Sequence, residues 1–278
     1  MIYKQLLKVI QWGDFIPNLC PKSEEEFNSR ERKVELEIRR FSKKANRLIE
    51  NIKVEDLIDK GGINPYLVTA LGFKTIEEAV EFFVMRRVER TLGTSFGNIL
   101  EKFIIIIFGG KSGKDVNSNC KKRQVKDKSW LCWWDVVIDR PIKDGNEKWN
   151  GIVMAVKSGP ANMDKDQVEH FCQKARQAEE KGYRPYLIFV YGKEAWSVIT
   201  TTLKSQGFHP KRYLRIGKEV FEEFFDDSGY YKRALELFSV GGLSKDLFEL
   251  IDTKKAALVK ELTIKYGKNL NEFLQSTF

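Results

Sequence analysis

Two apolar stretches separated by an amphipathic helix constrain the fold of this chain most. The stretch Gly151–Lys157, GIVMAVK, is followed by Ser-Gly-Pro and predicts a buried β-strand. Apolar residues at positions i, i+3, i+4 and i+7 then predict a helix from Asp164 to about Lys181, with Gly182 ending it. The stretch Arg184–Gly192, RPYLIFVYG, is almost wholly apolar, which is typical of a central strand buried on both faces.

Another strand and several helices complete the expected fold. Aromatic and β-branched residues in Trp130–Arg140 predict a strand that pairs with Gly151–Lys157 as a hairpin. Apolar spacing predicts a long helix over residues 24–58, and one or two helices, broken near LGTSFG, over residues 75–108. A weaker strand at RYLRIG precedes further helices. The expected class is α/β, with a mixed β-sheet core flanked by helices and helical additions at both ends.

The composition indicates a folded protein without a membrane span and disfavours two kinds of catalytic site. With 278 residues, 42% of them hydrophobic, the chain is long enough to bury a sizeable core. Its longest apolar run is too short to span a bilayer and no signal-peptide pattern is present, so we expect a cytoplasmic protein without membrane contact. Four cysteines without a CxxC pair and two histidines disfavour a zinc site and a histidine-activated nucleophile. The cysteines are expected to be reduced.

The formal net charge of +9 at pH 7 predicts a polyanionic partner. Seven basic residues between Lys111 and Lys128, against Asp115 and Asp127, give a local excess of five positive charges. Because Gly, Ser and Asn also mark this segment as irregular, it is either a solvated loop or a nucleic-acid contact. Its GGKSGKD sequence is no phosphate-binding P-loop, which would need Gly in place of Phe108 and Ser or Thr in place of Asp115.

Asp135 and Lys157 are polar residues on two strands that are expected to be neighbours. An ion pair would satisfy both, since an unpaired buried charge is costly. Alternatively, Asp135 ligates a hard divalent cation while Lys157 contacts a phosphate oxygen or the attacking water. Asp139 lies on the same strand face as Asp135 by the two-residue period and is a further candidate ligand.

These residues carry a resemblance to a nuclease family. Asp135, followed about twenty residues later by Ala155-Val156-Lys157, resembles the PD-(D/E)xK motif. The stretch VKSGPANMDKDQ is similar to the one after the catalytic lysine in type II restriction endonucleases of the PmeII and MjaII/TdeIII kind. Restriction enzymes that cut GGNCC-type sites also resemble the chain in GGINP, TSFGNILEK, YLIFVYG and GKEVFEEF.

The resemblance implies a restriction-endonuclease-like sheet and a Mg²⁺-dependent, site-specific cleavage of double-stranded DNA. It also implies a homodimer and, in the cell, a cognate DNA methyltransferase. Asp135 and the helix residue Glu101 would hold the metal, and Lys157 would assist the attacking water. The chain would form one endonuclease domain over residues 1–278, with a mainly helical part (1–90), a catalytic core (91–225) and C-terminal helices (226–278).

The chain departs from the motif at Ala155, which stands where the acidic metal ligand would be and cannot bind metal through its side chain. The acid could have moved to Glu169 on the following helix. Alternatively, the site works without it, using a backbone carbonyl and water. In the third explanation the chain is an inactivated variant of a nuclease. The alternative function is therefore a catalytically inactive DNA-binding protein, or an inactivated variant, on the same fold.

The start of the helix after Lys157 is expected to meet DNA, because free N–H groups and the helix dipole favour phosphate there. Asn and Gln side chains can also read adenine edges. The candidate DNA contacts are Ser158, Asn162, Asp164, Lys165 and Gln167 in this stretch, and Lys121, Lys122 and Arg123 in the basic segment.

Overall fold

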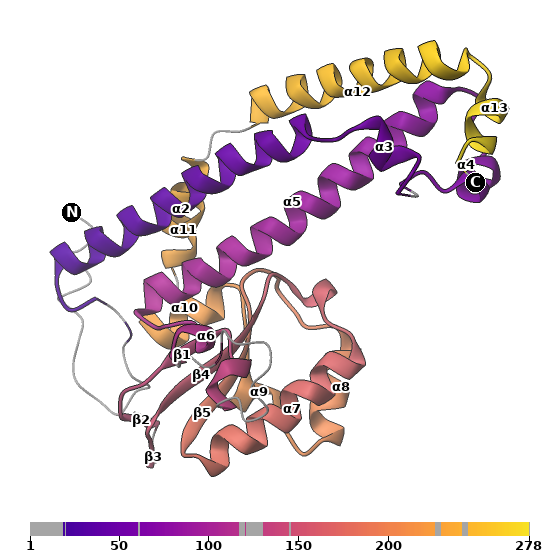
Figure 1. Ribbon diagram of the computed structural model, residues 1–278. Coiled ribbons are helices and arrows are strands. Elements are labelled where there is room, and N and C mark those ends of the chain that lie inside the picture. The colour runs from indigo at the N-terminus through magenta and orange to yellow at the C-terminus, as the bar shows by residue number, and fades with distance from the viewer. Residues whose placement is uncertain are drawn as a thin grey trace. The chain divides into compact units, whose positions relative to one another are not determined.

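The computed structural model describes residues 19, 21–60, 62–116, 120, 130–144, 146–225, 229–240 and 244–277 (Figure 1). Helices and a mixed β-sheet make up these residues, which confirms the α/β class. The chain forms two compact units. One comprises the described residues of Met1–Glu37 and Gly97–Ser239, and the other those of Ile38–Phe96 and Val240–Phe278. The single endonuclease domain stays a prediction.

The first unit contains a four-stranded sheet in the order β1-β4-β5-β6. Strand β1 (Val136–Ile138) is antiparallel to β4 (Gly151–Lys157), which is parallel to β5 (Tyr183–Phe189), and β5 is parallel to β6 (Leu214–Ile216). Helix α7 (Lys165–Glu180) connects β4 to β5, because a parallel pair needs a crossover. The predicted pairing of β1 with β4, the helix that follows and the central strand are therefore confirmed.

Short elements complete the first unit, and two long helices belong to both units. Helix α2 (Glu24–Glu50) and helix α5 (Ile76–Phe108) each run from one unit into the other. The remaining elements of the first unit are α6 (Gly113–Val116), η2 (Trp130–Trp133), β2 (Ile142–Asp144), β3 (Glu147–Trp149), η3 (Pro160–Asn162), α8 (Ser197–Ser205), α9 (Pro210–Tyr213), α10 (Lys218–Phe225) and α11 (Tyr230–Ser239).

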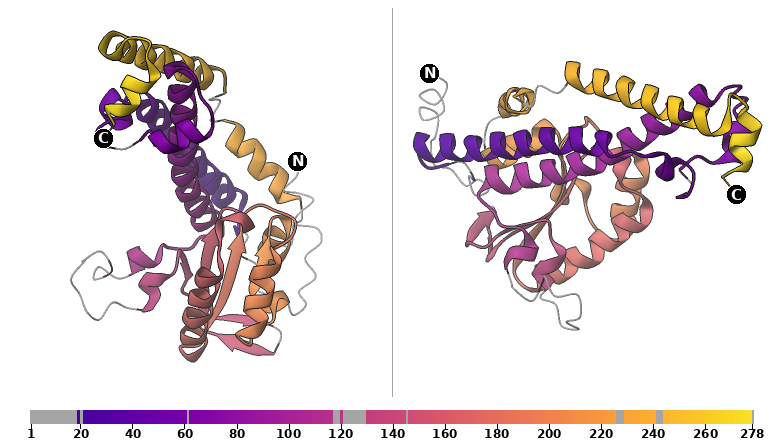
Figure 2. Two further views of the ribbon diagram at one scale, coloured as in Figure 1. Left: turned by 90° about the vertical axis from the view of Figure 1, so that its right-hand side faces the viewer. Right: turned by 45° about the horizontal axis from the view of Figure 1, so that its top comes forward.

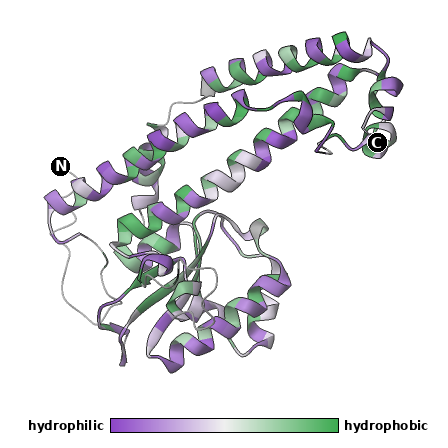
Figure 3. Ribbon diagram, viewed as in Figure 1, coloured by the Kyte–Doolittle hydropathy of each residue, from purple (hydrophilic) through white to green (hydrophobic). Residues whose placement is uncertain are grey.

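The sheet is buried between two layers of helices (Figure 2). On one face, Val153 packs in a hydrophobic cluster with residues of α7 and α8. On the other face, the ring of Tyr186 lies 5.0 Å from that of Phe224 in α10. The strands are predominantly hydrophobic in Figure 3, as burial on both faces requires. Because strand side chains alternate, residues 153, 155 and 157 of β4 all face α7.

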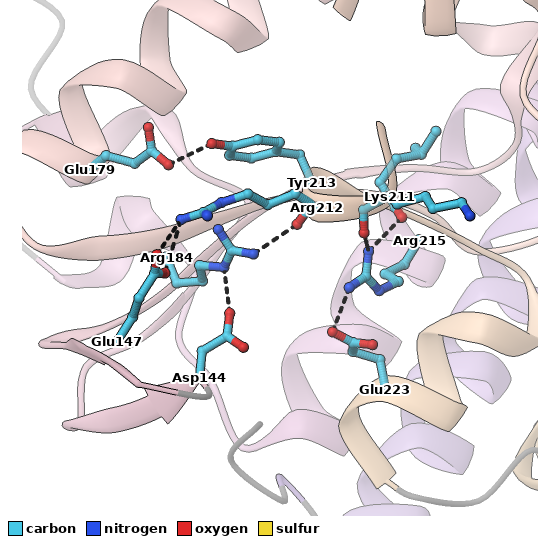
Figure 4. Close-up of polar contacts among 10 residues, drawn as sticks. Asp144, Glu147, Glu179, Arg184, Lys211, Arg212, Tyr213, Arg215 and Glu223 are labelled. Carbon is cyan, nitrogen blue, oxygen red and sulfur yellow. Dashed lines mark hydrogen bonds and ion pairs between the residues drawn. The ribbon is translucent and has the colours of Figure 1, made fainter. Parts of the chain in front are cut away.

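A small hairpin of β2 and β3 lies between β1 and β4 in the sequence. Figure 4 shows how arginines attach it to the sheet. The buried Arg184 of β5 lies with its Nε 2.9 Å from Asp144 Oδ2, and Arg212 of α9 donates to both carboxylate oxygens of Glu147 at 2.9 Å. Removing Asp144 would leave the buried charge of Arg184 uncompensated, whereas the exposed pair of Arg212 and Glu147 contributes little to stability.

The sheet is shorter than predicted at β1. Most of the predicted strand Trp130–Arg140 is not sheet: Trp130–Trp133 forms the 3-10 helix η2. Gly113 N donates to Trp134 O at 3.1 Å, and the close approach of backbone leaves no room for a Cβ on Gly113. Beside it, Lys111 and Val137 exchange backbone hydrogen bonds of 2.9 and 2.8 Å. The glycine-rich segment therefore covers the outer side of β1.

Helix α5 is one continuous helix of 33 residues, so a break near LGTSFG is wrong. A glycine inside a helix costs only about 1 kcal/mol relative to alanine, which the packing of a long apolar helix outweighs. Gly93 has open space around it, whereas a Cβ on Gly97 would lie 3.3 Å from Ser158 Oγ. Gly97 thus allows the helix to approach the end of β4 closely.

The second unit is helical. Its core includes Ile49 of α2, Val80 and Val84 of α5, Leu262 and Phe273. Its other elements are α3 (Val54–Leu57), α4 (Pro65–Ala70), α12 (Ser244–Tyr266) and α13 (Leu270–Gln275). Among the described residues, α5 alone is long and apolar enough to cross a membrane by length and composition. One such helix is weak evidence for a span, because core helices of soluble proteins meet the same criterion.

A disulfide joins Cys120 and Cys132, whose Cα atoms are 5.5 Å apart, so the expectation of reduced thiols is wrong for this pair. Cys172 is buried and free, and burial raises its pKa to about 11. No CxxC motif marks this pair, because the two cysteines are 12 residues apart. Disulfides persist mainly in oxidising environments and are rare in the cytoplasm. The disulfide therefore does not support the cytoplasmic location, which stays a prediction.

Reducing this disulfide is expected to lower the free energy of unfolding by about 2–3 kcal/mol, because it frees the unfolded chain from a closed loop of this length. Urea unfolding with and without reductant measures the change. A Cys120→Ser variant in non-reducing buffer should match the reduced protein. Equal unfolding midpoints for the oxidised protein and this variant would contradict the prediction.

Candidate active site

Asp135, Ala155 and Lys157 converge where β1 begins and β4 ends. Asp135 precedes β1 directly, and its N–H donates to Met154 O at 3.1 Å. The N–H of Val156 donates to Asp135 Oδ2 at 2.8 Å, which fixes the carboxylate beside β4. All three motif residues line one pocket of about 360 Å³.

The ion pair considered for Asp135 is not formed. Within the described residues, Asp135 and Lys157 are not within ion-pair distance of each other, and Asp135 is held by the backbone of β4 instead. Both side chains are partly buried at the same pocket. A negative and a positive group that face a common space without neutralising each other can each contact a bound molecule.

Glu101 of α5 belongs to the same electrostatic environment. Burial, and after it the negative charge of Asp135, raise its pKa from 4.5 to about 6, while Lys114 and Lys157 oppose the shift. A carboxyl in these surroundings loses its proton near neutral pH, and not in acid as an exposed glutamate does. Gly97, one turn earlier on α5, lets the helix come close to Ser158, as described above.

Lys174 is a site residue that the sequence analysis missed. It lies on α7, lines the pocket with Asp135 and Lys157, and donates from Nζ to Trp133 O at 2.9 Å. Burial lowers its pKa, the Asp135 charge raises it and the Lys157 charge lowers it. No motif marks this lysine. Helical spacing could have identified it, because residues 167, 171 and 174 lie on one face of the helix and Gln167 was already a candidate site residue.

The predicted DNA contacts at the start of α7 are only partly available to a ligand. Asp164 is the N-cap, and its Oδ1 accepts a hydrogen bond from Gln167 N at 2.9 Å. Lys165 lies 3.6 Å from Glu169 in an exposed ion pair. Asp164 and Gln167 line the pocket. Asn162 is the last residue of η3, two residues before the N-cap Asp164 in the sequence. Ser158 follows Lys157 directly. The basic residues Lys121, Lys122 and Arg123 lie outside the described residues.

Glu169, the possible replacement for the missing acid, and Asp139, the further candidate ligand, do not line the pocket. Glu169 is paired with Lys165 and does not line the pocket. Asp139 follows the far end of β1, where it accepts a hydrogen bond of 2.5 Å from Tyr183 OH. Since β1 is antiparallel to β4, Asp139 lies beside the beginning of β4 and Asp135 beside its end.

No protein-family model matches this chain. No curated protein sequence matches it either. What the site can do is therefore argued from its own geometry and charges.

Asp135, Asp164 and Asp166 are the carboxylates that line the pocket, and Glu101, which does not line it, is close enough for the negative charge of Asp135 to raise its pKa. Mg²⁺ is often bound by one or two carboxylates while it keeps several waters. The raised pKa of Glu101 reflects partly buried negative charge that a cation would compensate. In the described part of the chain, no group of three or more His, Cys, Asp or Glu residues could hold a metal. A Mg²⁺ ion held by Asp135 and Glu101 would be completed by water and substrate oxygens, because Ala155 offers no side-chain ligand.

Proposed function

We propose that the protein is a type II restriction endonuclease, which hydrolyses phosphodiester bonds at a specific sequence in double-stranded DNA with Mg²⁺ as cofactor. The observation that carries the proposal is the fixed position of Asp135. Its carboxylate is held by Val156 N–H next to Ala155 and Lys157, as two neighbouring strands of a PD-(D/E)xK nuclease would hold their motif residues. A restriction-endonuclease-like fold, a homodimer and a cognate methyltransferase belong to the same proposal.

The proposed chemistry assigns one role to each charged group. Bound Mg²⁺ would lower the pKa of water and offset the charge on the scissile phosphate. Asp135 and Glu101 would hold it through their carboxylates. Lys157 would donate to a phosphate oxygen and stabilise the added negative charge as the water oxygen attacks phosphorus. The bond from phosphorus to the 3′ oxygen breaks, this oxygen takes up a proton, and the 5′ end keeps the phosphate.

The second candidate is a DNA-binding protein that does not cut, and Ala155 favours it. Ala155 is 5% exposed and packs in the hydrophobic cluster between β4 and α7. With Lys157 and Lys174 at the same pocket, the site holds a phosphate-binding charge even without a metal. Such a protein would bind DNA in a salt-dependent manner and leave it intact.

An Ala155→Glu variant separates the two functions. The new carboxylate would project into the pocket beside Asp135 and supply the third acidic ligand. Unmethylated plasmid DNA is incubated with Mg²⁺ and either protein, and the fragment ends are sequenced. Cutting by the natural chain at one repeated sequence means that the site works with alanine at position 155, with the metal held by Asp135 and other groups. Cutting by the variant alone identifies an inactivated nuclease. If neither cuts while both shift DNA in a gel, the binding protein is the correct function.

A further inference from the structure

A second pocket adjoins the candidate active site along α7. It has a volume of about 420 Å³ and shares His170 and Lys174 with the first pocket. Trp133 and Gln177 line the second pocket but not the first. Its volume lies in the range of sites that bind small ligands. A molecule that extends from the first pocket past Lys174 would therefore enter the second.

The lining of this second pocket combines an aromatic ring, amide groups and basic side chains with one carboxylate, that of Glu180. Residue Trp133 is 53% exposed, and large aromatic side chains of this kind stack on nucleic-acid bases. Gln173 and Gln177 are exposed one helical turn apart and offer amide donors and acceptors. Arg176 adds a positive charge held in place by Gln206, whose backbone oxygen accepts from it at 2.7 Å.

Lys174 connects the two pockets. Its Nζ donates to Trp133 O, which fixes the backbone of the exposed tryptophan next to the shared cation. The same Nζ lies 5.0 Å above the ring of Trp134, which is buried. A lysine ammonium carries three donors, so Lys174 can still reach a phosphate oxygen.

We propose that the second pocket binds one unpaired base of the DNA strand, stacked on Trp133, with the adjoining phosphate on Lys174. This proposal rests on the proposed nuclease function and names the form of substrate that the site takes. A base in this pocket has left the duplex stack, which costs a few kcal/mol, and stacking on an aromatic side chain repays part of that cost. DNA that already has unpaired bases should therefore bind most tightly.

The test is binding of a fluorescein-labelled single-stranded oligothymidylate without divalent metal, followed by anisotropy. Replacing Trp133 by Ala is expected to raise Kd by roughly 5- to 150-fold, the range for loss of one stacked base, whereas Trp133→Phe stays within about threefold. Tyr66→Ala removes an exposed aromatic side chain of the second unit and serves as the matched control. A hairpin duplex should show a smaller effect of Trp133→Ala.

A second variant tests the role given to Lys174. Replacing it by Gln should reduce the slope of log Kd against log salt by about 0.7 on a single strand, while Lys174→Arg keeps the slope. Lys181→Gln, at the exposed end of α7, is the control. Equal Kd for the natural chain and Trp133→Ala, with equal thermal melting, overturns the base site even if plasmid is cut. A Trp133-dependent Kd in a protein that never cuts DNA leaves the base site standing and removes the nuclease function.

Discussion

Replacing Asp135 by Asn is expected to slow Mg²⁺-dependent DNA cleavage by about a thousandfold or more. Asn can still accept the hydrogen bond from Val156 N–H, so the local structure should persist. The variant loses the negative charge that would hold the metal, and metal-based charge stabilisation contributes several kcal/mol, or several powers of ten in rate. Initial rates of plasmid cleavage at saturating Mg²⁺ measure the loss.

Asp139→Asn is the matched control for this variant. It changes the same chemical group near the other end of β1, where the carboxylate accepts from Tyr183 OH. Cleavage by Asp139→Asn should stay within about threefold of the natural rate, because surface changes away from the site have small effects. DNA affinity of Asp135→Asn should be unchanged or higher, since a negative charge has been removed. Equal loss of cleavage in both variants would contradict the assignment of Asp135 to the metal.

Replacing Glu101 by Gln is expected to abolish cleavage and to stabilise the protein at neutral pH. Burial and the Asp135 charge hold the pKa of Glu101 at about 6, above its ordinary value of 4.5. The folded state therefore binds this proton more tightly than the unfolded state. The ionised group destabilises the fold fully above pH 6, and this cost disappears as the pH falls from 6 to 4.5. From the size of the shift, the gain at pH 7.5 is at most about 2 kcal/mol.

Urea unfolding of the natural chain and of Glu101→Gln at pH 7.5 and at pH 4.5 measures this effect. The two proteins should differ at pH 7.5 and agree near pH 4.5. Glu169→Gln is the control, because this glutamate forms an exposed pair with Lys165 and should give neither stabilisation nor loss of cleavage. If Glu101→Gln were less stable than the natural chain at pH 7.5, the ionised carboxylate would stabilise the fold, and the prediction would be wrong.

The parts of the fold that follow from local pattern were predictable from the sequence. The apolar run of β5 and the capped helix α7 have strong periodicity, and the Ser-Gly-Pro that follows Lys157 marks where β4 ends. The antiparallel pairing of β1 with β4 also followed, and with it the position of Asp135 opposite Ala155. Strand order and side-chain alternation sufficed for this part of the site.

The remaining features depend on contacts between distant segments. Lys174 joins the site only because α7 packs on the face of β4 that carries Lys157. The 3-10 helix before β1 depends on the close approach of Gly113, and the disulfide on where Cys120 and Cys132 come together. Local sequence signals for a helix, a strand or a loop carry no information on these contacts.

The two outer strands of the sheet limit how a second chain can attach. Both β1 and β6 are only three residues long, and Lys111 already pairs with the outer side of β1. Short edge strands offer few open backbone groups, and the edge of β1 is also covered, so the sheet resists the edge-to-edge pairing that leads to aggregation. A dimer of this protein would therefore be held by side chains of its helices and loops. A point substitution on such a helix or loop could then change which chain binds there, without disturbing the hydrogen bonds of the sheet.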